Sequence, residues 1–240
     1  MTEPRPAMTT REIGDCGGGR SPQPPAGPPS LAAFKQLSGA EARRALYIDF
    51  EGEKDKPPVL LGVLRHRGRG AEPYVLQVVV DSDFEPVGPK VRGFREAVDI
   101  VVLRGEHGDR RIVSWSQHDL EVVRRLGGDD PELVARFECR YANALGVAKL
   151  WANRLHPGEK PGDGQLVGYL ALIGYTVPPD GGPGHVGETI RALRPRLQGG
   201  RPLTQAQQRR WGRLLEHNRH DCAGMRAVCL RATRELESAG

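Results

Sequence analysis

Three short apolar runs, separated by polar turns, constrain the fold of this chain more than any other feature of its sequence. The runs are ALYIDF at 45–50, PVLLGVL at 58–64 and YVLQVVV at 74–80. Each is rich in Val, Leu, Ile or aromatic residues and is flanked by Gly or charged residues, a pattern typical of β-strands. The short joins between the runs favour antiparallel neighbours.

Helical patterns dominate the remainder of the chain. Residues 93–105 are predicted to form a helix, and RIVSWS at 111–116 a fourth strand. From residue 118 the pattern is mainly helical, with stretches near 131–155, 164–174 and 185–197 and a long final helix over about 204–236. Thr204 and Gln207 have the form of a capping box at the start of that helix. These elements predict an α/β domain with a mixed sheet, flanked by helices, and a helix-rich C-terminal half.

The first 30 residues differ in composition from the rest. They contain seven prolines and five glycines and almost no large apolar residue. Such a segment cannot bury enough surface to offset the entropy lost on ordering, so a disordered tail is expected at 1–30. The sequence has no internal repeat and no second linker of comparable strength, which predicts a single folded domain at 31–240.

Composition also narrows the class of protein. The longest uncharged stretch, 164–179, has 16 residues and is too short to span a membrane. The N-terminus mixes acids with bases and lacks an apolar segment, so no signal peptide is expected. Four scattered cysteines, none in C-x-x-C spacing, indicate reduced thiols and a cytoplasmic protein. The net charge of +5 tilts the chain slightly toward a polyanionic partner.

The glycine motif GPGHVG at 182–187 fits the pattern G-x-G-x-x-G. In a dinucleotide-binding fingerprint a strand comes directly before the glycines, whereas the preceding residues here are TVPPD. We therefore expect a loop at this position and no organic cofactor.

Asp49 and Glu51 are the first candidate functional residues. They end the first predicted strand, where alternation turns both toward one face and turns Ile48 and Phe50 toward the other. Two carboxylates about 7 Å apart on one face repel each other unless a cation lies between them. A hard divalent metal with oxygen ligands would suit this pair. The alternative is a strand that simply ends in the charged turn EGEKDK at 51–56.

Asp119 lies where the fourth strand passes into a helix, in the segment SWSQHD at 114–119. In the first turn of that helix its side chain would be beyond the C-terminal edge of the sheet. The alternative is ordinary helix capping, with Ser116 as the N-cap and Asp119 at the third helical position.

The final helix carries a third group, HNRHD at 217–221. His217 and Asp221 are four residues apart and share a helix face, within reach of one metal-bound water. Asn218 and Asp221 also lie on the apolar stripe of the helix, and polar residues on a buried face need a reason. The alternative is a solvated charged face.

In this order, D-x-E on a first strand, an acid after a fourth strand and an acid on a late helix resemble the DEDD exonucleases of the ribonuclease H-like superfamily. The resemblance is greatest to the YprB-type predicted exonuclease domains, whose last motif is roughly Tyr-Asn-x-x-Asp followed by small and apolar residues. Here that segment reads HNRHDCAGM at 217–225. The resemblance covers about residues 45–235.

The resemblance implies a 3′–5′ exonuclease that hydrolyses phosphodiester bonds of DNA or RNA with two Mg²⁺ or Mn²⁺ ions. It makes Asp49, Glu51, Asp119 and Asp221 the metal ligands. It also gives His217 the place of a tyrosine that orients the attacking water, and a histidine there could accept a proton near neutral pH. The histidine variant of the family has its histidine five residues before the last Asp, where this chain has Glu216.

Clustered arginines are the candidates for holding the phosphate backbone, since such contacts position a substrate without reading its sequence. They are Arg65, Arg67, Arg69, Arg124, Arg125, Arg209, Arg210 and Arg213. A solvated surface is the alternative for each cluster.

Two further hypotheses compete with the nuclease. A catalytically inactive nucleic-acid-binding or scaffolding module of the same fold would have carboxylates that are splayed apart or paired with arginines. An unrelated α/β domain with coincidental acids would have no carboxylate cluster.

Overall fold

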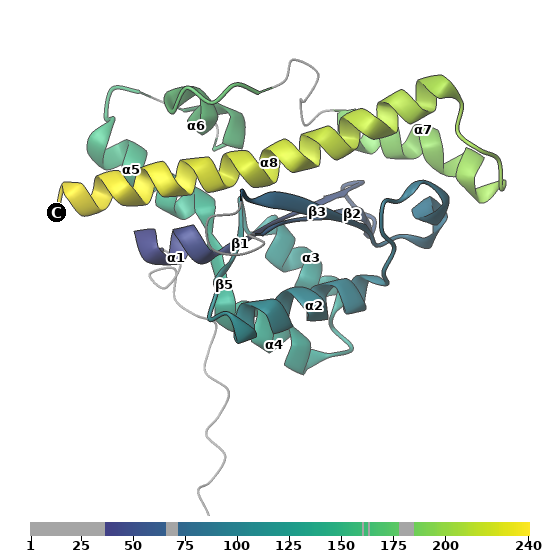
Figure 1. Ribbon diagram of the computed structural model, residues 1–240, viewed down its shortest axis with the longest axis horizontal. Coiled ribbons are helices and arrows are strands. Elements are labelled where there is room, and N and C mark those ends of the chain that lie inside the picture. Colours follow the sequence, from purple (N-terminus) through teal and green to yellow (C-terminus); the bar gives the residue numbers. More distant parts are fainter. Residues whose placement is uncertain (1–36, 66–71, 160, 163, 178–184) are drawn as a thin grey trace, which may run out of the picture. The chain divides into compact units, whose positions relative to one another are not determined.

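A five-stranded mixed sheet lies at the centre of the fold in the computed structural model, which describes residues 37–65, 72–159, 161–162, 164–177 and 185–240 (Figure 1). The strand order is β3-β2-β1-β4-β5. The strands are β1 Leu46–Gly52, β2 Pro58–Arg65, β3 Tyr74–Val79, β4 Ile112–Ser114 and β5 Tyr141–Asn143. The expected tail at 1–30 lies outside the described residues.

The pairing of the strands agrees with the prediction. β2 is antiparallel to both β1 and β3, whereas β4 runs parallel to β1 and β5 parallel to β4. The predicted α/β fold with a mixed sheet and a helical C-terminal half is therefore confirmed.

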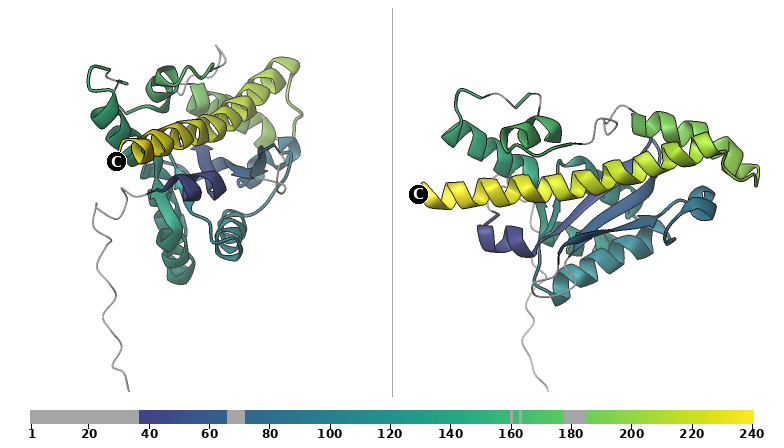
Figure 2. Two further views of the ribbon diagram at one scale, coloured as in Figure 1. Left: turned by 60° about the vertical axis from the view of Figure 1, so that its left-hand side comes forward. Right: turned by 45° about the horizontal axis from the view of Figure 1, so that its top comes forward.

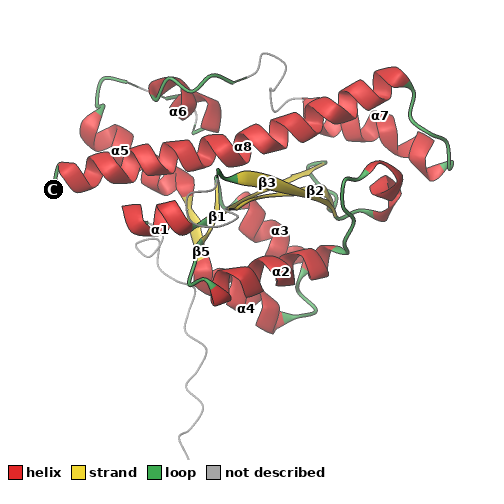
Figure 3. Cartoon of the chain, in the orientation of Figure 1, coloured by secondary structure: helices red, strands yellow, loops and turns green. Residues whose placement is uncertain are grey.

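Helices make up most of the remaining described chain (Figure 3). They are α1 Gly39–Arg44, the 3-10 helix η2 Ser82–Val87, α2 Phe94–His107, α3 His118–Leu126, α4 Pro131–Arg140, α5 Ala144–Leu155, α6 Leu166–Leu172, α7 Val186–Gln198 and α8 Gln205–Ser238. The Thr204 side chain and the Gln207 side chain form the capping box at the start of α8, as predicted. None of the described helices is long and apolar enough to cross a membrane.

The helical stretch expected near 131–155 is interrupted in the structure. The structure divides it into α4 and α5, with the short strand β5 between them. Tyr141 and Ala142 are buried there, and β5 extends the sheet by pairing with β4. Three residues are too few to show the twofold periodicity by which a strand is recognised.

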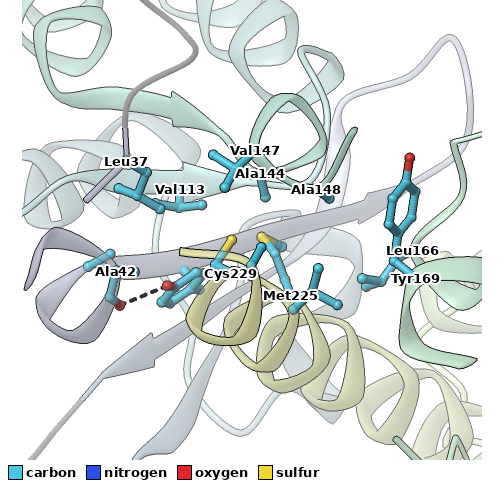
Figure 4. Packing of buried hydrophobic residues seen from close by; sticks show 14 of the residues in the cluster. Leu37, Ala42, Val113, Ala144, Val147, Ala148, Leu166, Tyr169, Met225 and Cys229 are labelled. Carbon is cyan, nitrogen blue, oxygen red and sulfur yellow. Dashed lines mark hydrogen bonds between the residues drawn. The ribbon is translucent and has the colours of Figure 1, made fainter. Parts of the chain in front are cut away.

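Side chains of β1 alternate between two apolar clusters on opposite faces of the sheet. Ile48 and Phe50 pack with residues of α2, α3 and α4, whereas Tyr47 packs with residues of α5 and α8. On the second face the Tyr47 hydroxyl donates to the carbonyl of Ala42 at 2.7 Å. Figure 4 shows Ala42 in this cluster together with Met225 and Cys229 of α8. The face beneath α8 is also the face to which Asp49 and Glu51 belong, because they alternate with Ile48 and Phe50.

A third apolar cluster packs η2, α7 and the start of α8 against the first residues of β2 and the last residue of β3. It includes Phe84, Ile190 and Trp211, and the Trp211 indole N–H donates to the carbonyl of Val87 at 3.0 Å. In two further views α8 runs across the sheet with α7 beside its N-terminal part (Figure 2). This packing fixes α7 next to the end of β1.

Candidate metal centre

Three elements bring the predicted acidic residues together. β1 contributes Asp49 and Glu51 near its C-terminal end, α3 contributes Asp119 in its first turn, and α8 contributes Asp221 near its middle. β1 and β4 are parallel neighbours, so the helix that follows β4 starts at the edge where β1 ends. We refer to these four side chains as the carboxylate cluster.

Glu51, His217 and Asp221 form a compact group in the site, referred to below as the triad. The Nε2 atom of His217 lies 3.5 Å from Asp221 Oδ2 and 3.7 Å from Glu51 Oε1. One ligand atom from each residue lies within 4.8 Å of the other two. Glu51 and His217 are buried, while the Asp221 side chain is 29% exposed and reaches solvent. This group could hold a metal ion.

Asp49 is held in place by Asn218, which is fully buried. The Asn218 side-chain amide donates to the Asp49 carboxylate at 2.9 Å and to the Asp49 carbonyl at 3.1 Å. In turn, the Gln77 side chain donates to Asn218 Oδ1 at 3.1 Å and to the carbonyl of Leu215. Both the oxygen and the nitrogen of the Asn218 amide are therefore hydrogen-bonded, which fixes the amide and, through it, the orientation of the Asp49 carboxylate.

Gly62 makes room for this arrangement. Asp49, Gly62 and Gln77 are register partners across β1, β2 and β3 and share one face of the sheet. A Cβ atom at Gly62 would lie 2.3 Å from Asn218 Oδ1, far inside van der Waals contact. A glycine within a strand marks such a close approach.

Asp119 faces β1 rather than capping its own helix. Its Oδ1 atom accepts a hydrogen bond from the Phe50 backbone N–H at 3.2 Å, and the residue is only 5% exposed. The N-cap of α3 is Gln117, whose side chain makes no capping hydrogen bond. The Ser116 hydroxyl oxygen accepts a hydrogen bond from the His118 N–H at 3.3 Å, as an N-cap side chain does. Ser116 therefore contributes a capping hydrogen bond, as the alternative predicts, whereas the Asp119 side chain is directed to β1.

The carboxylate cluster is electrostatically strained in the absence of a cation. Burial, and then the charge of Asp49, raises the pKa of Asp119 to about 8. Burial and the charges of Asp49 and Asp119 raise the pKa of Asp221 to about 8. Burial and the neighbouring carboxylates also raise the pKa of Glu51, and burial raises that of Asp49. Within the described part of the chain, no lysine or arginine forms an ion pair with these four side chains.

A pocket of about 410 Å³ opens beside the triad and is lined by all three of its residues. Its basic lining residues are Lys54 and Lys56 of the β1–β2 turn and Arg191 of α7. Phe50 and Val186 are among its apolar lining residues. The pocket therefore places cationic side chains next to an acidic wall.

The predicted arginines lie elsewhere. None of those within the described residues lines the pocket. Arg124 pairs with Glu138 at 2.5 Å, and Arg125 donates to the carbonyl of Lys56 at 3.3 Å. The remaining ones are Arg65, which stacks over the Tyr74 ring at 4.9 Å, and the exposed Arg209, Arg210 and Arg213 on the first turns of α8. Arg67 and Arg69, like the glycines at 182 and 184, lie outside the described residues.

The sequence carried one signal for Asn218, its place on the apolar stripe of the final helix. It carried no signal for Gln77 or Gly62. Gln77 and Gly62 become part of the site only through the register of β2 and β3. Lys54 and Arg191 have no local pattern that marks them, because the packing of α7 against the end of β1 makes them neighbours.

Comparison with protein-family models, with curated proteins and with solved structures gives no match to this chain. The chemistry of the site has therefore to be inferred from the side chains that form it. Buried carboxylates and an imidazole around a solvent-accessible pocket could hold a metal ion.

Proposed function

We propose that this chain is a metal-dependent nuclease that hydrolyses phosphodiester bonds of DNA or RNA, and that it acts as a 3′–5′ exonuclease of the DEDD type. One observation carries the proposal: four carboxylates from three elements gather beside a pocket with basic lining, without a lysine or arginine partner among the described residues. Buried charges of one sign are costly unless they are paired or coordinate a metal. Divalent cations supply that compensation.

The fold gives independent support. A ribonuclease H-like domain implies three antiparallel strands extended by parallel ones, and the order β3-β2-β1-β4-β5 has that composition. Each acid lies on the type of element that the resemblance requires: a first strand, the helix after the fourth strand, and a late helix. A coincidental set of acids would give no cluster.

In the proposed mechanism, Asp49, Glu51, Asp119 and Asp221 hold the metal ions. When bound, the ions supply an activated water and stabilise charge on the attacking and leaving oxygens. Asn218 fixes the direction of the Asp49 carboxylate, and the Phe50 N–H does so for Asp119. Lys54, Lys56 and Arg191 hold the phosphate backbone in the pocket by charge, without reading the sequence.

The test is a cleavage assay on end-labelled single- and double-stranded DNA and RNA, with Mg²⁺ or Mn²⁺ against EDTA. Metal-dependent cleavage should be lost in Asp49→Asn and in Asp221→Asn. Asp109→Asn is the matched control, because Asp109 is 87% exposed and its left-handed backbone conformation (φ 42°) suits asparagine. The ladder of products distinguishes end processing from internal cutting.

The inactive binding module predicts a different outcome in the same assay. No cleavage would occur with either metal, while nucleic acid would still bind and the affinity would fall steeply with salt. That combination would contradict the proposed nuclease.

A further inference from the structure

His217 occupies a position between carboxylates of two different elements. Its Nε2 atom is 3.5 Å from Asp221 Oδ2 on α8 and 3.7 Å from Glu51 Oε1 on β1. Both distances exceed the usual hydrogen-bond range of roughly 2.7–3.2 Å. By contrast, two ligand atoms about 2.1 Å from one ion at tetrahedral angles are roughly 3.4 Å apart. The spacing of the triad is thus closer to that of ligands around a cation than to that of hydrogen-bonded partners.

Glu51 gives a second, independent indication of a cation site. Its side chain is only 9% exposed, and its Oε1 atom is buried without accepting a hydrogen bond. This is the same oxygen that faces His217 Nε2. A buried carboxylate oxygen without a hydrogen-bond donor is costly, and a metal ion at the centre of the triad would satisfy it.

The helix fixes two of the three ligand positions in advance. His217 and Asp221 are four residues apart on α8 and therefore lie on one face. Neighbouring residues of α8 are anchored on either side, because Asn218 is bonded to Asp49 and Cys222 is fully buried. A ligand pair on a rigid helix is preorganised for binding.

From this geometry, and on the basis of the proposed function, we infer that His217 is a nitrogen ligand of the metal, and that the triad selects a first-row transition cation over Mg²⁺. Mg²⁺ takes oxygen ligands in nearly octahedral geometry and rarely accepts imidazole, whereas imidazole suits Fe²⁺, Ni²⁺, Cu²⁺ and Zn²⁺. Mn²⁺ is a paramagnetic member of the same row and serves as the spectroscopic probe. The resemblance gives His217 the place of a water-orienting tyrosine. Here the imidazole instead becomes part of the metal site and changes its preference.

The experiment is Mn²⁺ binding to the full chain, followed by electron paramagnetic resonance, with Mg²⁺ as competitor. Bound Mn²⁺ should show hyperfine coupling to a directly coordinated nitrogen, and Mg²⁺ should displace it poorly. His217→Gln should abolish the coupling and weaken Mn²⁺ binding on the order of 10- to 100-fold. His118→Gln is the matched control, because His118 also lines the pocket and its removal should leave the nitrogen signal intact.

Failure of this inference and failure of the proposed function give different results. If Mn²⁺ binds in a manner that requires Asp221 but shows no nitrogen coupling, His217 is not a ligand, although a metal site exists. Equal competition by Mg²⁺ in the native protein and in His217→Gln would likewise overturn the selectivity. If neither ion binds the native chain, both the inference and the proposed nuclease are contradicted.

Discussion

Glu51 and Glu53 are two residues apart, yet they belong to acidic groups of opposite kinds. Glu53 lies 3.5 Å from Arg194 Nε, and Asp81 and Asp83 each lie 2.7 Å from Arg194 Nη1; these four residues form the Arg194 cluster. The chain thus provides its own cation there. In the carboxylate cluster no such residue is present among those described, and Glu51 keeps a buried oxygen without a hydrogen bond. The Arg194 cluster stabilises the fold. In the carboxylate cluster the negative charges have no such partner, and a bound metal ion would compensate them.

The largest effect on cleavage should come from removing the charge of Glu51. Glu51→Gln should lower kcat/KM for metal-dependent cleavage by on the order of 10²–10³-fold, and it should raise the melting temperature of the metal-free protein by relieving repulsion. Glu53→Gln should lower the melting temperature, since it removes a partner of Arg194 and Lys56, and it should change cleavage much less than Glu51→Gln, because Glu53 lines the pocket but is not a proposed metal ligand. Equal losses of cleavage in the two variants would abolish the distinction between the clusters.

The metal-free protein should become less stable as the pH rises. Asp119 and Asp221 have folded-state pKa values of about 8 but ordinary values near 4 when unfolded. Between these limits the folded state binds more protons, so the free energy of unfolding falls from about pH 4 to about pH 8. Urea unfolding at several pH values in EDTA measures the slope. Mn²⁺ should flatten it, and so should Asp221→Asn; a slope that neither change reduces would assign it to other groups.

Removing the positive charge of Arg194 should destabilise the protein. The Arg194 side chain is 17% exposed and lies over the Phe84 ring, so Arg194→Met leaves three carboxylates without their common partner. Breaking a buried ion pair costs about 3–5 kcal/mol, and partial exposure reduces this to about 2–3 kcal/mol. Urea unfolding is the measurement, and Arg191→Met, exposed on the same helix, should cost less than about 0.5 kcal/mol. Similar losses in both variants would count against the cluster.

The smallest effect is expected at Gly62. Gly62→Ala pushes against Asn218 Oδ1 and should destabilise the protein by about 1–3 kcal/mol while weakening Mn²⁺ binding through Asp49. Gly212→Ala is the control, because it lies in α8 with open space around it and should stabilise by about 0.5–1 kcal/mol. Calorimetric titration with Mn²⁺ and urea unfolding separate the two effects. An unchanged Mn²⁺ affinity in Gly62→Ala would show that metal binding does not depend on the position in which Asn218 holds Asp49.

The sequence predicted those parts of the molecule that have a local period. Alternation along β1 correctly assigned Ile48 and Phe50 to the face opposite Asp49, and the capping box correctly located the start of α8. β5 was missed because its three residues follow α4 directly and carry no period of their own. Its position depends on pairing with β4, a contact between segments distant in sequence.

The same division holds within the site. Asp49, Glu51, Asp119 and Asp221 could be predicted as a set only through the resemblance to the DEDD exonucleases, because each motif by itself had an ordinary alternative. The cations of the pocket could not, since Arg191 reaches it only through the packing of α7. Clusters of arginine in the sequence pointed to residues 65–69, to α3 and to the first turns of α8, whereas the structure brings two lysines of the β1–β2 turn and one arginine of α7 to the pocket.

The length of α8 has a consequence for how the site can move. The helix has 34 residues, or about 51 Å at 1.5 Å per residue, and it carries His217 and Asp221 near its middle. Its amide protons at these two positions should exchange with solvent nearly as slowly as the protein unfolds globally, because no local opening frees this turn without breaking the core around it. Adjustment to a substrate thus falls to the other wall of the pocket, the β1–β2 turn with Lys54.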